Sequence, residues 1–288
     1  MTAPRILLSN DDGINAPGIE ALEESLHRLG ELWVVAPARE QSATSHKISL
    51  HEPLRVYPMG TRKFAVEGSP ADCVYMGLNE LLPASPDVVV SGINAGPNLG
   101  NDIMYSGTVA AAMEGVLLGY PGIAVSLCLP EKREGGWSPA QKDFTVAAEY
   151  ISELVSAVLK DPMKPGTLLN INVPFLPKDE IQGTKLCRLG YTDWAQSVTK
   201  RIDPRGRPYY WIGGEREGLD HIADSDNKAI AERCISVTPV HFDMTDANAF
   251  TYVRNLQVEG FRAVDDDLST GPLELTRPIR SQKSKPLI

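Results

Sequence analysis

The sequence predicts an α/β protein built on a mostly parallel sheet that helices cover on both faces. Two observations predict it: short runs rich in β-branched residues, and amphipathic or alanine-rich segments between those runs. Continuous apolar strands that alternate with helices are typical of parallel sheets buried on both sides. A third observation, a strand–turn–strand pattern with exposed-looking aromatic residues, predicts a β-hairpin arm in the second half of the chain.

The first 174 residues alternate strands with helices. In chain order, the predicted strands cover 5–8, 32–37, 88–90, 122–127 and 167–173, and the predicted helices cover 16–30, 106–119 and 143–160. The first helix has Pro17 in its first turn and Gly30 at its end, which are favoured positions for these residues. The alanine-rich helix is opened by Ser106 and closed by Gly119.

The second half of the chain changes character. Residues 197–214 read as a hairpin, with Asp203, Pro204 and Gly206 in turn positions and the aromatic run Tyr209–Trp211 beside them. Such a hairpin must cover a surface, either on its own domain or on a second subunit. Residues 229–245 return to a helical turn and a strand, and the tail from about residue 272 is expected to be loosely held.

Composition excludes several classes of function. The chain has 288 residues and a formal net charge of -9, so sequence-blind binding to duplex nucleic acid is not expected. No apolar stretch approaches the length of about 20 residues that a membrane span needs, and the first residues do not resemble a signal peptide. The four cysteines form no CxxC pair and read as reduced thiols of a cytoplasmic protein.

Polar loops follow three of the predicted strands, where open parallel sheets bind ligands. After the first strand come Asn10, Asp11, Asp12 and Gly13, which read either as a tight turn or as a metal site. Two carboxylates held close together repel each other unless a cation lies between them. The loop after the second strand contains Ser42, whose hydroxyl is a possible metal ligand or simply part of a solvated loop.

The third loop, with the sequence SGINAGPNLGNDIMYSGTVAAAMEG, is the most informative. Glycines and asparagines alternate through it, and it runs into Ser106, Gly107 and Thr108 at the start of a helix. Ser106 is a possible helix cap, but the free amides of a helix N-terminus also bind anions. The spacing matches neither the dinucleotide-binding fingerprint nor a P-loop, so we expect a phosphate cradle of another kind.

Four stretches together resemble the SurE family of 5'-nucleotidases: ILLSNDDG, VVAP with the following Ser42, GSPADCVYMGL, and VVVSGINAGPNLGNDIMYSGTVAAAMEG. The resemblance covers about residues 5–246 and fades in the tail. It implies a Rossmann-like domain over residues 1–246, with an oligomerising arm at about 190–215, followed by a C-terminal helix and tail over 247–288. It also implies a homodimer or homotetramer that forms through this arm.

The resemblance further implies roles for individual residues. The metal ligands would be Asp11, Asp12, Ser42 and Asn94, and the phosphate would be held by Asn98, Ser106, Gly107 and Thr108. All four metal ligands offer oxygen, which suits Mg²⁺ or Mn²⁺ better than zinc, with Ca²⁺ as a further occupant. We therefore expect one divalent ion per subunit.

The expected reaction is hydrolysis of nucleoside 5'-monophosphates by metal-assisted attack of water. Asp11, Asp12 and Asn98 are the candidate catalytic residues, with either aspartate as the acceptor of the water's proton and Asn98 as a stabiliser of phosphate charge. Activity on 3'-nucleotides or polyphosphate is a possible addition. Two alternatives remain at this point: a covalent mechanism with Asp11 or Ser106 as nucleophile, and a nucleotide- or metal-binding regulator without turnover.

Overall fold

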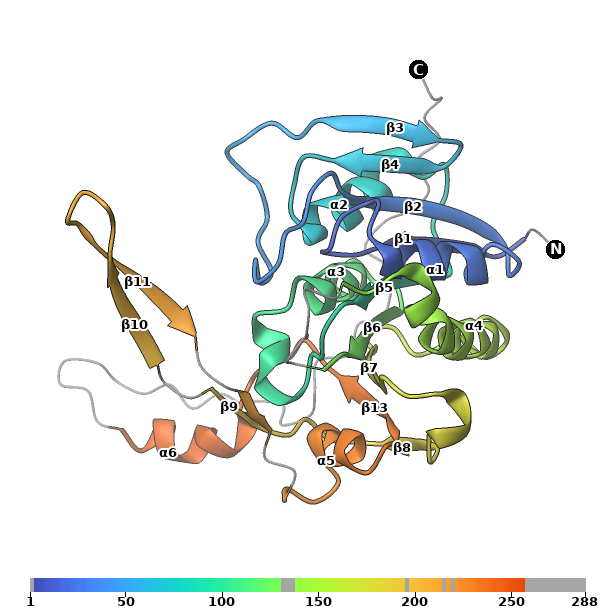
Figure 1. The fold of residues 1–288 in the computed structure, drawn as a ribbon. Coiled ribbons are helices and arrows are strands. Elements are labelled where there is room, and N and C mark those ends of the chain that lie inside the picture. Colours follow the sequence, from blue (N-terminus) through green and yellow to red (C-terminus); the bar gives the residue numbers. More distant parts are fainter. Residues whose placement is uncertain (1–2, 131–137, 195–196, 214–215, 219–220, 257–288) are drawn as a thin grey trace.

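A nine-stranded sheet forms the centre of this computed structural model, which describes residues 3–130, 138–194, 197–213, 216–218 and 221–256 (Figure 1). The strand order is β3-β4-β2-β1-β5-β6-β7-β13-β8. The strands are β1 (Arg5–Ser9), β2 (Glu31–Pro37), β3 (Val56–Gly60), β4 (Lys63–Val66), β5 (Val88–Asn94), β6 (Gly122–Cys128), β7 (Leu168–Pro174), β8 (Thr184–Leu186) and β13 (Ile235–Val240).

The sheet is mostly parallel, as the sequence predicts. The six strands from β4 to β7 in this order are parallel to their neighbours. The exceptions lie towards the two edges, where β3 runs antiparallel to β4 and β13 runs antiparallel to β7, with β8 parallel to β13. The predicted Rossmann-like α/β class is therefore confirmed.

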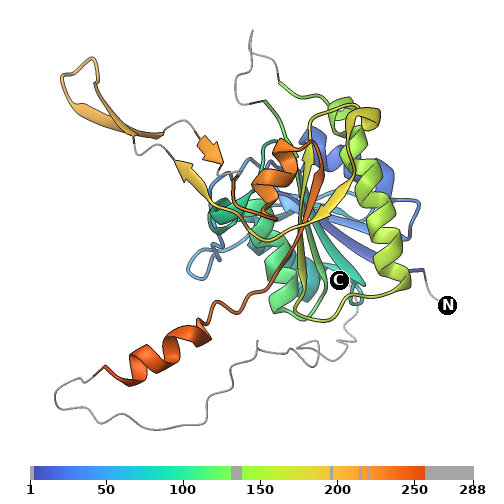
Figure 2. The same cartoon turned by 90° about the horizontal axis from the view of Figure 1, so that it is seen from below.

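Helices cover both faces of the sheet (Figures 1 and 2). The α-helices are α1 (Pro17–Leu26), α2 (Pro70–Met76), α3 (Gly107–Leu117), α4 (Thr145–Lys160), α5 (Asp226–Ala231) and α6 (Phe250–Arg254). Short 3-10 turns cover Gly100–Met104, Gln141–Phe144, Lys178–Glu180 and Ala247–Ala249, and a π-helical turn covers Gly77–Leu81. Helix α1 packs against α4 on one face, and α2 packs against α3 on the other. Among the described residues, no helix combines the length and apolarity that crossing a membrane requires.

The hydrophobic core divides between the two faces because neighbouring side chains on a strand point in opposite directions. In β1, Ile6 and Leu8 join the cluster that includes residues of α1 and α4, whereas Leu7 joins the cluster on the α2 face. All three side chains are fully buried. This two-sided burial explains why β1 is a continuous apolar run in the sequence, and it fixes where the loop after β1 leaves the sheet.

The structure corrects several predicted boundaries. The first helix ends at Leu26 rather than running to Gly30. The Leu29 N–H bonds back to the Leu26 carbonyl in a turn, and the Glu31 N–H bonds to the Pro4 carbonyl at 2.7 Å as β2 begins. The strand predicted at 88–90 continues to Asn94, and its pairing with β6 shifts register between Ser91 and Asn94. Strands β3 and β4 and helix α2 lie within residues 50–82, where the sequence predicts no element.

The predicted hairpin is present and projects from the body (Figure 1). Strands β10 (Ser197–Ile202) and β11 (Pro208–Gly213) pair antiparallel, and at their base β9 (Thr192–Trp194) pairs with β12 (Arg216–Gly218). The Asp203 carboxylate closes the turn by accepting hydrogen bonds from the amides of Arg205 and Arg207 at 2.8 and 2.9 Å. Tyr210 and Trp211 are exposed, as expected.

The structure describes only part of the predicted C-terminal region, as far as residue 256. Helix α6 falls in the region where a C-terminal helix was predicted, and the tail expected from about residue 272 lies outside the described residues. The domain boundary at residue 246 stays a prediction.

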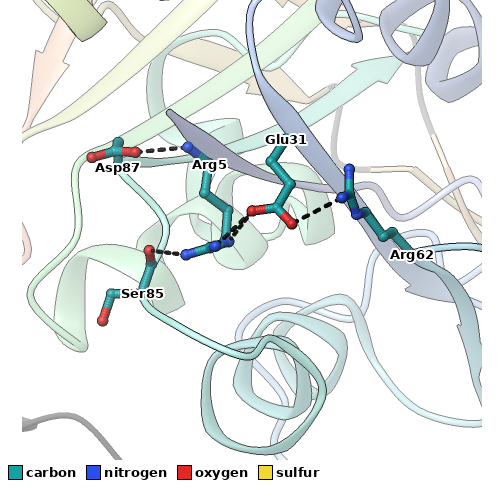
Figure 3. Close-up of polar contacts among 5 residues, drawn as sticks. All are labelled: Arg5, Glu31, Arg62, Ser85 and Asp87. Carbon is teal, nitrogen blue, oxygen red and sulfur yellow. Dashed lines mark hydrogen bonds and ion pairs between the residues drawn. The ribbon is translucent and has the colours of Figure 1, made fainter. Parts of the chain in front are cut away.

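An ionic network joins the amino-terminal ends of β1 and β2 (Figure 3). The Glu31 carboxylate contacts the Arg5 guanidinium at 2.5 Å and the Arg62 guanidinium at 3.1 Å. The Arg5 amide donates to the Asp87 carboxylate at 2.7 Å, and its guanidinium donates to the Ser85 carbonyl at 3.1 Å. The network joins β1, β2 and the segment before β5 at the amino-terminal end of the sheet.

Candidate metal and phosphate site

The loop after β1 is a tight turn closed by Asn10. The buried Asn10 amide donates from Nδ2 to the Gly13 carbonyl at 2.8 Å, and its Oδ1 accepts from the Gly13 N–H at 3.2 Å. Gly13 has a φ of 101°, a conformation that residues with a side chain rarely adopt. The turn and metal-site interpretations of this stretch are therefore compatible, because the turn is what presents Asp11 and Asp12 at the end of the strand.

Asp11 lies against the first turn of α3. Its Oδ1 accepts a hydrogen bond from the Thr108 hydroxyl, and a Cβ placed on Gly107 would lie 2.9 Å from its Oδ2. Burial raises the pKa of the Asp11 carboxyl, and the Thr108 hydrogen bond opposes part of that rise. The positive end of the helix dipole also favours a negative charge here. The sequence-predicted Asp11, Gly107 and Thr108 are thus brought together.

Asp12 connects the first loop to the third. Its carboxylate Oδ2 accepts from the Ala95 N–H at 3.2 Å, one residue beyond Asn94 at the end of β5. The Asn94 amide donates from Nδ2 to the Gly96 carbonyl at 2.8 Å. Because this bond uses the amide nitrogen, the side-chain oxygen of Asn94 is the atom suited to a cation.

The loop after β2 is tied to the same place through its backbone. The Gln41 N–H donates to the Asp11 carbonyl at 2.8 Å, which brings the neighbouring Ser42 into the region. The exposed Ser42 hydroxyl donates to the Glu40 carboxylate at 2.8 Å. The negative charge of Glu40 also contributes to the raised pKa of Asp11. Sequence reasoning missed Glu40, although its position two residues before Ser42 was a usable signal.

Ser106 begins α3 as its N-cap. Its buried side-chain oxygen accepts from the Val109 N–H at 3.1 Å and keeps its own proton for an acceptor such as a phosphate oxygen. Thr108 was expected to bind phosphate as well, but its side chain is fully buried and its hydroxyl is donated to Asp11. The hydroxyl is therefore committed to Asp11, and the role of Thr108 in phosphate binding stays a prediction.

Asn98 is held in place by the sheet. Its buried side chain donates to the Ser126 hydroxyl at 2.7 Å. Its backbone N–H donates to the Asn172 Oδ1 at 2.8 Å, and its carbonyl accepts from both Asn170 and Asn172 at 2.9 Å. The sequence analysis missed these asparagines of β7, although two amides that alternate within an apolar strand are unusual. We call residues 98–101 the phosphate loop.

The three predicted loops therefore converge at the carboxyl ends of β1, β2 and β5. Hydrogen bonds join Asp11 to α3, Asp12 to the end of β5, and the Asp11 carbonyl to the Ser42 loop. Within the described ranges, no three His, Cys, Asp or Glu side chains gather in a way that could hold a metal. The arrangement instead offers two carboxylates, a hydroxyl and an amide oxygen, a donor set that fits Mg²⁺ or Mn²⁺.

Comparison with known proteins agrees with this arrangement. The family model described as survival protein SurE matches residues 6–196. A 5'-nucleotidase SurE of Anaeromyxobacter dehalogenans is 50% identical over 260 residues, covering 89% of this chain and 97% of that protein. The protein of the same name from Moorella thermoacetica is 48% identical over 246 residues, covering 84% and 91%.

A solved structure is also similar. The SurE protein from Aquifex aeolicus is 41% identical and superposes with a TM-score of 0.75, covering 87% of this chain and 98% of that one. The likeness therefore extends over nearly the whole length of each of these relatives.

Proposed function

The chain belongs to the SurE family and is a 5'-nucleotidase, a hydrolase of phosphoric monoesters, and from that premise we propose that it hydrolyses nucleoside 5'-monophosphates with one divalent metal ion per chain. A single observation carries the assignment to this site: the Asp11 carboxylate lies at the N-terminus of α3. The turn that holds it also carries Asp12. This arrangement supports the proposal of a cation site beside an anion site, the pair that metal-assisted hydrolysis of a phosphate ester uses.

The residues proposed to hold the ion are Asp11, Asp12, Ser42 and Asn94. They fit a hard cation because each presents an oxygen, and because the carboxylates gather negative charge at one end of the sheet. We propose Mg²⁺ or Mn²⁺, with Ca²⁺ as a further occupant. When bound, such an ion supplies a Lewis acid for a phosphate oxygen and lowers the pKa of a bound water.

The phosphate is proposed to bind at the start of α3. The Ser106 hydroxyl and the N–H of Gly107 donate toward it, and the helix dipole favours its negative charge. Asn98 is proposed to stabilise the charge on the equatorial oxygens as water attacks phosphorus and the bond to the nucleoside oxygen breaks. Hydrogen bonds between the Asn98 backbone and the side chains of Asn170 and Asn172 in β7 hold this residue in place.

Of the two aspartates, we propose Asp12 as the group that takes the proton of the attacking water. Asp11 is buried and has one oxygen bonded to Thr108 and the other against Gly107. Asp12 is only half-buried, so its carboxylate is the more accessible of the two. This assignment divides the roles: Asp11 as ligand alone, and Asp12 as ligand and base.

The aromatic arm is proposed to join chains into a homodimer or homotetramer. Its exposed apolar side chains form a surface of the kind that marks protein interfaces. They are Val198, Ile202, Tyr209, Tyr210, Trp211 and Ile212. We also propose action in the cytoplasm, where the free thiols of Cys73, Cys128, Cys187 and Cys234 would stay reduced.

The test is release of inorganic phosphate from AMP, GMP and CMP by the purified protein with Mn²⁺ or Mg²⁺, with and without a chelator. We expect release that the chelator abolishes and that added metal restores. Release from none of the nucleotides would favour a non-catalytic regulator and contradict the proposal. Adenosine 3'-monophosphate and short polyphosphate extend the same assay to the proposed side activities.

The same assay distinguishes the covalent alternative. Direct attack by water leaves no phosphate on the denatured protein when the reaction is stopped with acid during turnover. Acid-stable phosphate on the chain would instead identify Asp11 or Ser106 as a nucleophile.

A further inference from the structure

Asp226, the first residue of α5, is a fully buried carboxylate that plays no part in the proposed chemistry. It accepts three backbone hydrogen bonds: from Gly100 and Gly190 at 2.8 Å and from Asn227 at 2.9 Å. Burial raises the pKa of its carboxyl, and these amides oppose part of the rise. A buried carboxylate is costly unless it is hydrogen-bonded. Besides its neighbour Asn227, the partners of Asp226 are main-chain groups of two segments that are distant in the sequence.

The first of these segments is the phosphate loop, and the second is the base of the arm just before β9. Other bonds join the same segments. The Thr192 N–H donates to the Asn101 side-chain oxygen at 2.6 Å, and the Asn227 side-chain amide donates to the Tyr191 carbonyl at 2.8 Å. Residues 99–101, 190–192 and 226–227 thus form a polar junction, which we call the loop–arm junction.

The contact within the junction is tight. Gly100 has a φ of 55°, and a Cβ on it would lie 2.8 Å from the Gly190 carbonyl. A Cβ on Gly190 would lie 3.0 Å from the Asp226 Oδ1. Because both positions are glycine, the two backbones approach closely enough for one carboxylate to bind both amides. Little room is left for either segment to move independently of the other.

The position of this junction affects the whole phosphate loop. Gly100 begins the 3-10 turn Gly100–Met104, which leads directly to the N-cap Ser106, and Asn98 lies two residues earlier. The sheet fixes Asn98 through β7, and Asp226 fixes the other end of the loop. These contacts hold the chain at Asn98 and at Gly100, and the turn that follows Gly100 leads to Ser106.

We propose that Asp226 is a positioning residue: by binding the Gly100 amide it holds the phosphate loop in the shape that binds phosphate. The inference rests on the function proposed above, because the loop has this role only if the site binds phosphate. Asp226 touches neither substrate nor metal in this account and acts through Gly100.

The test is Asp226→Asn, which keeps the shape of the side chain but places one N–H group where a carboxylate oxygen accepted a hydrogen bond. Asp203→Asn is the matched control, since Asp203 also accepts backbone amides, but at the tip of the arm. Inorganic phosphate is titrated into each Mn²⁺-loaded protein by calorimetry, and KM and kcat for AMP are measured in parallel.

We expect Asp226→Asn to weaken phosphate binding and raise the KM for AMP by about tenfold, because loss of the Gly100 bond leaves the loop in its binding shape only about a tenth of the time. Asp203→Asn should match wild type in its Kd for phosphate and its KM for AMP. If Asp226 only stabilises the fold, Asp226→Asn will lower the melting temperature and the folded fraction but leave Kd and KM unchanged. That result would overturn the proposal.

A second variant covers the case in which Asp226→Asn does not fold. Asn101→Ala removes the junction's bond to Thr192 from a half-buried position, and it should shift phosphate binding in the same direction by a smaller factor. Unchanged binding in Asn101→Ala would then contradict the proposal. If wild type binds phosphate without hydrolysing AMP, the proposed activity fails while the calorimetry still decides the role of Asp226.

Discussion

The two ends of the sheet treat negative charge in opposite ways. At the amino-terminal end, the Glu31 carboxylate lies between the guanidinium groups of Arg5 and Arg62 (Figure 3). At the carboxyl end, Asp11 receives a neutral hydroxyl from Thr108, and the charge of Glu40 adds to its environment. One end neutralises its carboxylate within the chain, and the other accumulates negative charge.

Under the proposed function, this difference separates a carboxylate that stabilises the fold from carboxylates that hold a cation. An ion pair satisfied by the chain's own arginines stabilises the fold and needs no ligand. Carboxylates that lie near one another without a cationic partner repel each other, and a divalent cation relieves that repulsion. Four substitutions, two of them at carboxylates in the loops at the carboxyl end, test this contrast.

Asp12→Asn should have the largest effect. The amide can still accept from Ala95, so the fold should persist, but a charged ligand and the proposed base are lost. We expect AMP hydrolysis to fall at least about a hundredfold, with an unchanged or higher melting temperature. Asp87→Asn, at the amino-terminal end, should retain the wild-type rate. A wild-type rate in Asp12→Asn would contradict both roles.

Ser106→Ala should mainly weaken phosphate binding. Loss of a hydrogen bond to a charged group costs about 2 kcal/mol, so inorganic phosphate should compete with AMP about thirtyfold less well. Loss of the N-cap should also lower the free energy of unfolding by about 1 kcal/mol.

The matched control for that substitution is Ser69→Ala, because Ser69 caps α2 in a similar way. It should lose at least as much stability, because the Ser69 hydroxyl also donates to the Lys47 carbonyl at 2.5 Å, without the change in phosphate competition. Equal competition by phosphate in wild type and Ser106→Ala would remove Ser106 from the phosphate site.

Glu40→Gln tests whether the carboxylate that accepts the Ser42 proton supports the metal. Partners of metal ligands orient them and raise their basicity, and losing one typically weakens metal affinity tenfold or more. We expect the Mn²⁺ concentration for half-maximal AMP hydrolysis to rise about tenfold. The same substitution at Glu67, an exposed partner of Arg55, should leave the Mn²⁺ dependence unchanged. If Glu40→Gln also leaves the Mn²⁺ dependence unchanged, the Glu40–Ser42 bond has no part in metal binding.

Glu31→Gln should leave activity unchanged and reduce stability. The variant removes the charge between the half-buried Arg5 and the exposed Arg62. The free energy of unfolding, measured by urea denaturation, should fall by about 1 kcal/mol. High salt should shrink the difference from wild type because it screens the pair. A large loss of kcat in this variant would mean that the two ends of the sheet are not independent.

The elements that the sequence predicts well are those with local signals. Buried strands such as β1 are continuous apolar runs, and α3 carries both its cap and its final glycine in the sequence. The convergence of the three loops also follows from strand order, since parallel strands end at the same edge. The sequence therefore indicates both the position of the candidate site and its charge.

What the sequence does not reveal are contacts between distant segments. Thr108 bonds to Asp11 across 97 positions, and Gly100 bonds to Asp226 across 126. Neither pair has a local pattern, so the sequence alone predicts neither the Thr108–Asp11 bond nor the Asp226–Gly100 bond. The edge strand β3 was missed because most of it is exposed and it contains Pro58, so it lacks the apolar run of a buried strand.

We propose that the carboxyl end of the sheet holds a cation while the amino-terminal end does not. Mn²⁺ binding, followed by electron paramagnetic resonance in wild type, Asp12→Asn and Glu31→Gln, tests this without reliance on turnover. We expect one Mn²⁺ per chain in wild type and in Glu31→Gln, and affinity weakened at least about a hundredfold in Asp12→Asn. Equal Mn²⁺ binding by wild type and Asp12→Asn would contradict it.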